Sequence, residues 1–148
     1  MKSDVKISEN RLEITRVFDA PREQVFAAWK EAEQLQVWWG CDMTRKVESQ
    51  IDFAPGGKFC HKMTIEGAGE MDYAGVFEEI TEPEKIIYRA DFGPIKAEIT
   101  VEFHEEQGKT RLVLTQVGFP NSEMCEIVSG GFTAAFDKLE RLLLQQAA

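Results

Sequence analysis

Hydrophobic and polar residues alternate along much of the chain with a period of two, the pattern of strands that bury one face. The alternation starts in residues 11–19, where Leu12, Ile14, Arg16 and Phe18 share a face. It recurs in six segments between residues 46 and 117, separated by short turns. Because such turns join neighbouring strands, these six segments are predicted to form an antiparallel meander with one buried face, which with the first strand makes seven strands.

Breaks in this alternation predict where elements start, stop or bend. Residues 20–39 contain two short helical segments, the first beginning at Pro21 and the second ending at Gly40. Glycine tolerates the positive φ angle at which helices often end, so Gly40 is a suitable terminator. Further along, Ile80 is out of parity with Phe77, which predicts a bulge in the strand that contains them.

The last segment changes to steps of three and four residues over about six turns, which predicts one long amphipathic helix. Asn121 or Ser122 can cap its start. The apolar stripe consists of Met124, Ile127, Val128, Gly131, Phe132, Ala135, Phe136, Leu139, Leu142 and Leu143. A stripe of this length requires the helix to lie across the sheet.

Composition narrows the class of protein. The 148 residues suffice for one domain with its own core. A net charge of −9 repels nucleic acid and anionic membrane surfaces, so neither is an expected partner. No apolar run reaches the roughly 20 residues of a membrane span and the first ten residues are polar, so we expect a cytoplasmic protein. Cys41, Cys60 and Cys125 are too widely spaced for a structural zinc site and are expected to be reduced thiols.

Four segments carry a family resemblance: FDAPREQVFAAWKEAEQLQVWWG, IDFAPGGKF, YAGVFEEITEPEKIIY and GGFTAAFDKLERLL. Together they resemble the successive motifs of the START-like (SRPBCC) superfamily, in the branch named after the activator of heat-shock protein 90 ATPase. The resemblance runs from about residue 12 to the C-terminus. Two positions depart from the family pattern: Ala54 stands where many relatives have arginine, and Phe132 stands where tryptophan is common. Both departures could reshape a pocket.

The resemblance implies an α+β helix-grip fold in a single domain, residues 1–148. In this fold a curved seven-stranded antiparallel sheet surrounds the long C-terminal helix, with two short helices after the first strand and a cavity between sheet and helix. Trp38 and Trp39 would lie at the mouth of that cavity. Either one ring packs on the core while the other lines the opening, or both rings plug the end of a packed barrel.

Several residues are predicted to face the interior and are candidates for ligand binding. These are Trp38, Trp39, Phe59, His61, Met63, Tyr73, Phe77, Tyr88, Gln116, Met124, Ile127 and Val128. The polar members Tyr73, Tyr88 and Gln116 could orient oxygen atoms of a ligand or hydrogen-bond one another. Gly131 and its neighbour Gly130 could clear space for a ligand or allow close packing.

Candidate catalytic chemistry is sparse. His61 is predicted on the inner face and His104 on the outer one, so they are not expected to meet. His61 either contacts a ligand or is a hydrogen-bonded core residue. Cys60 and His61 point to opposite faces of their strand and cannot chelate a metal together. No catalytic residue, metal ion or cofactor is therefore predicted.

Three classes of function remain. The preferred one is binding of a small hydrophobic molecule in the cavity, by a monomer or homodimer. The family name supplies a second, a chaperone-associated role in the stress response, although the chain is expected to lack the separate N-terminal domain of activators of the chaperone's ATPase. The third is a cofactor-free cyclase or hydrolase, which is less favoured because no acid–base pair is visible.

Overall fold

The computed structural model describes residues 3–8, 10–92 and 95–147. The strands are β1 (Asp4–Ser8), β2 (Arg11–Phe18), β3 (Thr44–Ile51), β4 (Lys58–Ile65), β5 (Gly69–Thr81), β6 (Lys85–Phe92), β7 (Ile95–Glu106) and β8 (Lys109–Val117). The helices are α1 (Arg22–Lys30), α2 (Ala32–Trp38) and α3 (Ser122–Ala147).

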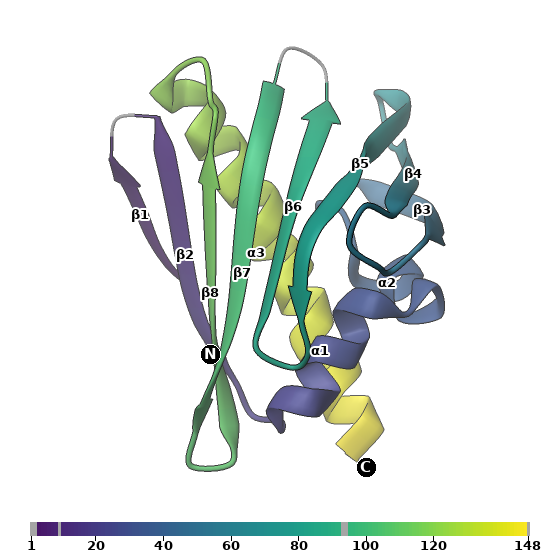
Figure 1. The fold of residues 1–148 in the computed structure, drawn as a ribbon. Coiled ribbons are helices and arrows are strands. Elements are labelled where there is room, and N and C mark those ends of the chain that lie inside the picture. The colour runs from purple at the N-terminus through teal and green to yellow at the C-terminus, as the bar shows by residue number, and fades with distance from the viewer. Residues whose placement is uncertain (1–2, 9, 93–94, 148) are drawn as a thin grey trace.

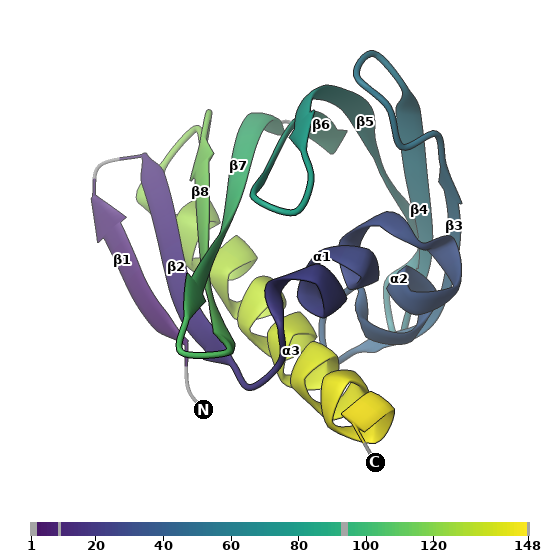
Figure 2. The same cartoon turned by 60° about the horizontal axis from the view of Figure 1, so that its bottom comes forward.

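All the strands form one antiparallel sheet in the order β1-β2-β8-β7-β6-β5-β4-β3. Figure 1 shows β1 and β3 at opposite edges, and Figure 2 shows the sheet curving around the three helices on its concave side. The predicted α+β helix-grip fold is thus confirmed. No described helix combines the length and the hydropathy that crossing a bilayer requires.

The predicted number of strands is wrong, because the sheet has eight rather than seven. The additional strand is β1, which pairs with β2 from Asp4 opposite Thr15 to Ser8 opposite Arg11. Most β1 side chains are exposed and only Ile7 packs partly against the core. Val5 and Ile7 alternate with polar residues, but two apolar positions in a strand of five residues are too short a pattern to predict a strand.

Local backbone contacts explain where α1 begins and where α2 ends. Pro21 is the N-cap of α1 rather than its first helical residue, and its carbonyl accepts hydrogen bonds from the amides of Gln24 and Val25. Gly40 follows α2 with a φ of 91°. A Cβ atom there would lie 2.5 Å from the Thr44 hydroxyl oxygen, so both conformation and space require glycine.

The predicted bulge in β5 is present, with a register shift between Phe77 and Glu79. Beside it, the amide of Phe77 donates to the carbonyl of Gly57, and the Phe77 carbonyl accepts from Gly56. The Pro-Gly-Gly turn between β3 and β4 is therefore tied to the middle of β5, which helps this end of the sheet to curl.

Helix α3 crosses the concave face and begins at an Asn121 cap, whose Oδ1 accepts from the amide of Met124 at 2.9 Å. The predicted stripe is buried along most of its length, with Leu139 fully buried. The inward position predicted for Ile127 is wrong, because its side chain is 61% exposed. At about 100° per residue, Ile127 lies roughly 120° around the helix axis from Leu139, beyond the edge of the buried stripe.

A buried arginine joins α3 to the sheet. Arg16 of β2 is 2% exposed, and its guanidinium pairs with Asp137 at 2.8 Å and Glu140 at 3.4 Å, both on α3. A buried guanidinium without anionic partners would be strongly destabilising. The helix must therefore present these carboxylates to β2, which sets its position along the sheet.

Replacing Leu139 with alanine tests the position of α3. We expect Leu139→Ala to lower the free energy of unfolding by about 2–5 kcal/mol in urea titrations, because it removes a fully buried side chain. The matched control is Leu144→Ala on the same helix, where the side chain is 56% exposed and the loss should be about 0.5 kcal/mol or less. Equal losses would show that the buried face of α3 is assigned incorrectly.

Candidate functional site

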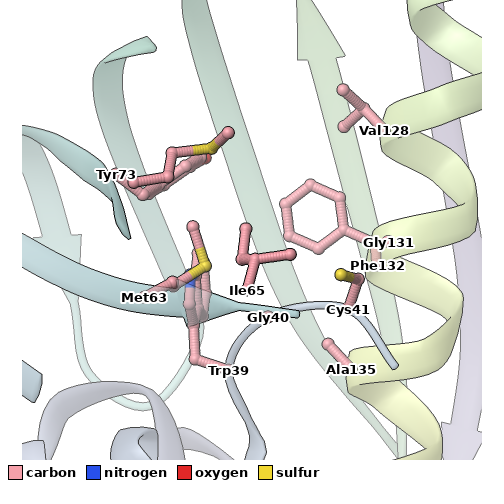
Figure 3. Close-up of a pocket in the computed structure, with 11 residues that line it drawn as sticks. Trp39, Gly40, Cys41, Met63, Ile65, Tyr73, Val128, Gly131, Phe132 and Ala135 are labelled. Carbon is pink, nitrogen blue, oxygen red and sulfur yellow. The ribbon is translucent and has the colours of Figure 1, made fainter. Parts of the chain in front are cut away.

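A pocket of about 170 Å³ lies between α3 and the part of the sheet formed by β4 and β5 (Figure 3). Its walls are almost entirely apolar. The lining residues are Trp39, Gly40, Cys41, Met63, Ile65, Met71, Tyr73, Val128, Gly131, Phe132 and Ala135. Met71 is 46% exposed, so this side of the pocket meets solvent.

The pocket exists because small residues face it where α3 stands away from the sheet. The helix packs against β1, β2 and the two short helices. Towards β4 and β5 it presents Gly131 and Ala135, and a Cβ atom on Gly131 would meet only the Cys41 side chain, at 4.0 Å. The absence of a side chain at Gly131 therefore leaves open space instead of allowing close backbone packing.

The two adjacent tryptophans have different environments. Trp38 is fully buried, and its indole Nε1 donates a hydrogen bond of 2.9 Å to the carbonyl of Ala28 in α1. Trp39 is the C-cap of α2, and its ring forms the inner wall of the pocket. The ring centroids are 5.3 Å apart in an edge-to-face arrangement. One ring thus belongs to the core, and the other separates the core from the pocket.

The segment that carries Trp39 is held by α3. The Lys138 ammonium donates to the backbone carbonyls of Trp39 at 3.1 Å and Cys41 at 3.3 Å. Burial lowers the pKa of Lys138, consistent with a half-buried ammonium whose partners are carbonyl groups. These contacts fix the backbone at the pocket wall.

A second, smaller void of about 20 Å³ lies behind the Trp39 ring. Trp39 lines both spaces, so its ring is the wall between them. Residues of α1, α2, β3, β4, β5 and β6 complete the inner void, among them Trp29, Phe59, Phe77 and Tyr88.

Comparison with known proteins identifies the family. Residues 19–144 match the family model described as activator of Hsp90 ATPase homolog 1-like protein. The chain belongs to this AHSA1-like family. No curated protein has a matching sequence.

Solved structures share the fold of this AHSA1-like chain. A protein from Rhizobium leguminosarum is 26% identical, with a TM-score of 0.78 over 98% of this chain and 99% of its own. An AHSA1-like protein from Aeromonas hydrophila is 21% identical, with a TM-score of 0.75 over 88% and 93%. A protein from Rhodobacter sphaeroides is 18% identical, with a TM-score of 0.83 over 97% and 99%. For the proteins from Aeromonas hydrophila and Rhodobacter sphaeroides, whose identities are 21% and 18%, the similarity supports the fold alone.

In this AHSA1-like chain, two of the residues that line the inner void, His61 and Tyr88, carry polar groups. His61 is 3% exposed, and its Nδ1 is 2.9 Å from the Ser49 hydroxyl oxygen. Burial lowers the pKa of His61 to about 4, so the ring is neutral at pH 7. The hydroxyl oxygens of Tyr73 and Tyr88 are 3.2 Å apart, and burial raises the pKa of both phenols. The two tyrosines therefore form a hydrogen bond with one another, which is one of the two roles that the sequence left open.

The candidate residues from the sequence fall into three groups. Four of them line the outer pocket, namely Trp39, Met63, Tyr73 and Val128. Four others line the inner void, namely Phe59, His61, Phe77 and Tyr88. The remaining four, Trp38, Gln116, Met124 and Ile127, line neither space.

Gln116 is fully buried on β8, and neither amide atom has a hydrogen-bond partner among the described residues. Its predicted inward position holds, but it does not reach the pocket.

The sequence-based candidates missed several wall residues. Ile65 and Met71 share parity with Met63 and Tyr73, and that signal could have identified them. Ala135 belongs to the apolar stripe of the last helix, and that signal could have identified it as well. Cys41 carries no such signal, because its position depends on how the α2–β3 connection meets α3. Among the described residues, no group of three His, Cys, Asp or Glu side chains is arranged to hold a metal ion.

The neutral, buried state of His61 predicts a pH-dependent stability. Unfolded histidine binds a proton below about pH 6.5, whereas the native ring does so only near pH 4. Stability contributed by neutral His61 should therefore be lost as the pH falls from about 6.5 to 4. Between pH 7.5 and 5 the loss in unfolding free energy should be on the order of 2 kcal/mol in urea titrations.

Two histidine variants isolate this effect. His61→Gln should flatten the pH dependence, because it removes the group that titrates differently in the two states. His104→Gln should retain it, since the His104 side chain is 41% exposed on the outer face of the sheet. An unchanged slope in His61→Gln would show that the ring is not held neutral by burial.

Proposed function

We propose that this AHSA1-like protein binds a small, uncharged hydrophobic molecule in the pocket between α3 and the β4–β5 part of the sheet. The observation that carries the proposal is the apolar lining of a pocket of about 170 Å³ with one side exposed to solvent. An engineered cavity of about 150 Å³ with comparable walls binds benzene. A single aromatic or alicyclic ring is therefore the expected minimum occupant.

The walls favour an uncharged ligand. Cys41 and Tyr73 are the titratable residues in the lining, and burial raises the pKa of Tyr73, which keeps its phenol neutral. A carboxylate or ammonium entering this space would lose its hydration without gaining an oppositely charged partner. The same composition supports binding rather than acid–base catalysis, because the lining contains no carboxylate, lysine or histidine.

The walls also favour a rigid ligand of limited size. Trp39 and Phe132 lie edge to face with ring centroids 6.0 Å apart, and both line the pocket. A flat ring placed beside them can make the offset or edge contacts that aromatic pairs prefer. Phe132 is smaller than the tryptophan common in relatives at this position, which supports a roomier pocket.

Adjacent glycines in α3 provide a direct test of the pocket. Gly131 lines it, whereas a Cβ atom on Gly130 meets nothing within 4 Å. We expect N-phenyl-1-naphthylamine to bind the native protein at micromolar concentrations, about −8 kcal/mol, and to change tryptophan fluorescence. Gly131→Leu should fill the pocket and weaken the probe at least about tenfold, or about 1.4 kcal/mol.

The matched control is Gly130→Leu, which adds the same side chain one residue away, on an exposed part of the helix. Both substitutions replace a helical glycine and should not reduce helix stability. Gly130→Leu should bind the probe as the native protein does. Equal affinity in both variants, or binding only under partly unfolding conditions, would refute the proposed site.

A second candidate function is suggested by the family description, which refers to activation of the Hsp90 ATPase. We rank it second because the most specific feature of this chain is a pocket sized for a small molecule. Adding the purified protein to the purified chaperone should therefore leave the rate of ATP hydrolysis unchanged. A severalfold, saturable increase in that rate would reverse the ranking.

A further inference from the structure

The wall between the outer pocket and the inner void is one side chain. The Trp39 ring contacts both spaces, which have volumes of about 170 Å³ and 20 Å³. Measured between ring centroids, it lies 5.1 Å from Tyr73 on the outer side and 4.6 Å from His61 on the inner side. Figure 3 labels Trp39 and Tyr73 among the residues that line the outer pocket. Displacement of this ring would join the two spaces.

One residue that lines the inner void carries a hydrogen-bond donor without an acceptor among the described residues. Trp29 lines the void and is 4% exposed, and its indole Nε1 is buried with no hydrogen-bond partner among the described residues. Leaving such a donor unpaired costs about 1–3 kcal/mol. Buried polar groups in native proteins are nearly always paired, so this N–H can donate to an acceptor from outside the chain, either a water molecule or an oxygen atom of a ligand.

The other polar groups around the void are compatible with an uncharged acceptor. The ring of His61 uses Nδ1 for its contact with Ser49, its one hydrogen bond within the described part of the chain. The Tyr88 hydroxyl is engaged with Tyr73. No lysine or arginine lines the void, so an anionic oxygen would be desolvated without a counter-ion. About 20 Å³ is enough for one oxygen atom, since a water molecule needs about 10–15 Å³ by the same measure.

Trp39 differs from its neighbour in how its side chain is held. The indole N–H of Trp38 is bonded to Ala28, whereas the Trp39 side chain has no hydrogen bond in the described structure. The hydrogen bonds of Trp39 are made by its backbone, whose amide donates to Leu35 and whose carbonyl accepts from Lys138, and its ring is held by packing against neighbouring aromatic rings. The next residue is Gly40, which has no side chain to restrict the ring.

We propose that Trp39 is a movable partition, and that the ligand is an apolar ring bearing one uncharged hydrogen-bond-accepting oxygen, such as a ketone. The ring of the ligand occupies the outer pocket, and its oxygen passes behind Trp39 to accept a hydrogen bond from Trp29 Nε1. This inference rests on the proposed function, since it defines the chemistry of a ligand for the same pocket.

Two probes of nearly the same shape test the inference. Isopropylbenzene and acetophenone differ in that the latter has a carbonyl oxygen in place of a methyl group. In ¹H–¹⁵N spectra, the indole N–H signal of Trp29, assigned with Trp29→Phe, should move downfield with acetophenone and not with isopropylbenzene. Trp29→Phe should weaken acetophenone about five- to tenfold more than isopropylbenzene, because it removes the donor and keeps an aromatic ring.

A Trp39 variant tests the partition itself. Trp39→Ala removes the ring that must be displaced, so the association rate of acetophenone should rise. An unchanged association rate would refute the movable partition.

The outcomes separate the two proposals. If both probes bind the native protein, Trp29→Phe affects them equally and the Trp29 signal does not move, the inference is overturned and the proposed function stands. If neither probe binds the native protein, the proposed function fails and the inference fails with it.

Discussion

The apolar face of the sheet is wider than its long helix can cover, and the rest of the structure depends on how the uncovered part of that face is filled. Eight strands about 4.8 Å apart span roughly 34 Å, whereas a helix with its side chains is about 10–12 Å wide. Helix α3 covers the β1–β2 side, and α1 and α2 lie beside it within the curve of the sheet (Figure 2). Towards β4 and β5 the remaining width is filled partly by aromatic rings and left partly open as the pocket.

Electrostatic interactions determine the position of the pocket as much as packing does. Arg16 is buried, so Asp137 and Glu140 must lie over β2, and this requirement sets the position of α3 along the sheet. On the same helix, Gly131 precedes Asp137 by a little over one and a half turns and Ala135 by about half a turn, and both face β4 and β5. An ion pair on one side of the helix thus determines which small residues form the pocket on the other.

The fold could be predicted from the sequence because strand alternation, turn residues and the helical stripe are local signals. Strand β1 was not predicted because its alternation covers only five residues with two apolar positions. Ile127 was misplaced because the spacing of apolar residues does not show where the buried face of a helix ends. The pocket was less predictable. Adjacent residues at the end of a helix point in different directions, and which of Trp38 and Trp39 faces the pocket depends on the path of the chain after Gly40. That path is set by contacts of Cys41 with Thr44 and by the hydrogen bonds from Lys138, which is almost 100 residues away in the sequence.

The pocket also has a consequence for stability. In a closed core, a void of this size would reduce stability by about 4 kcal/mol, at about 24 cal/mol per Å³. Because the pocket meets solvent at Met71, the actual reduction is smaller, but its apolar walls remain poorly packed against water. The pocket walls keep their positions because contacts outside the pocket fix the segments that form them. Lys138 holds the Trp39 segment, the turn at Gly57 holds β5, and Arg16 holds α3. A pocket maintained in this way is preorganised, so an apolar ligand that fills it gains packing without ordering the chain, and its binding energy adds directly to the stability of the fold.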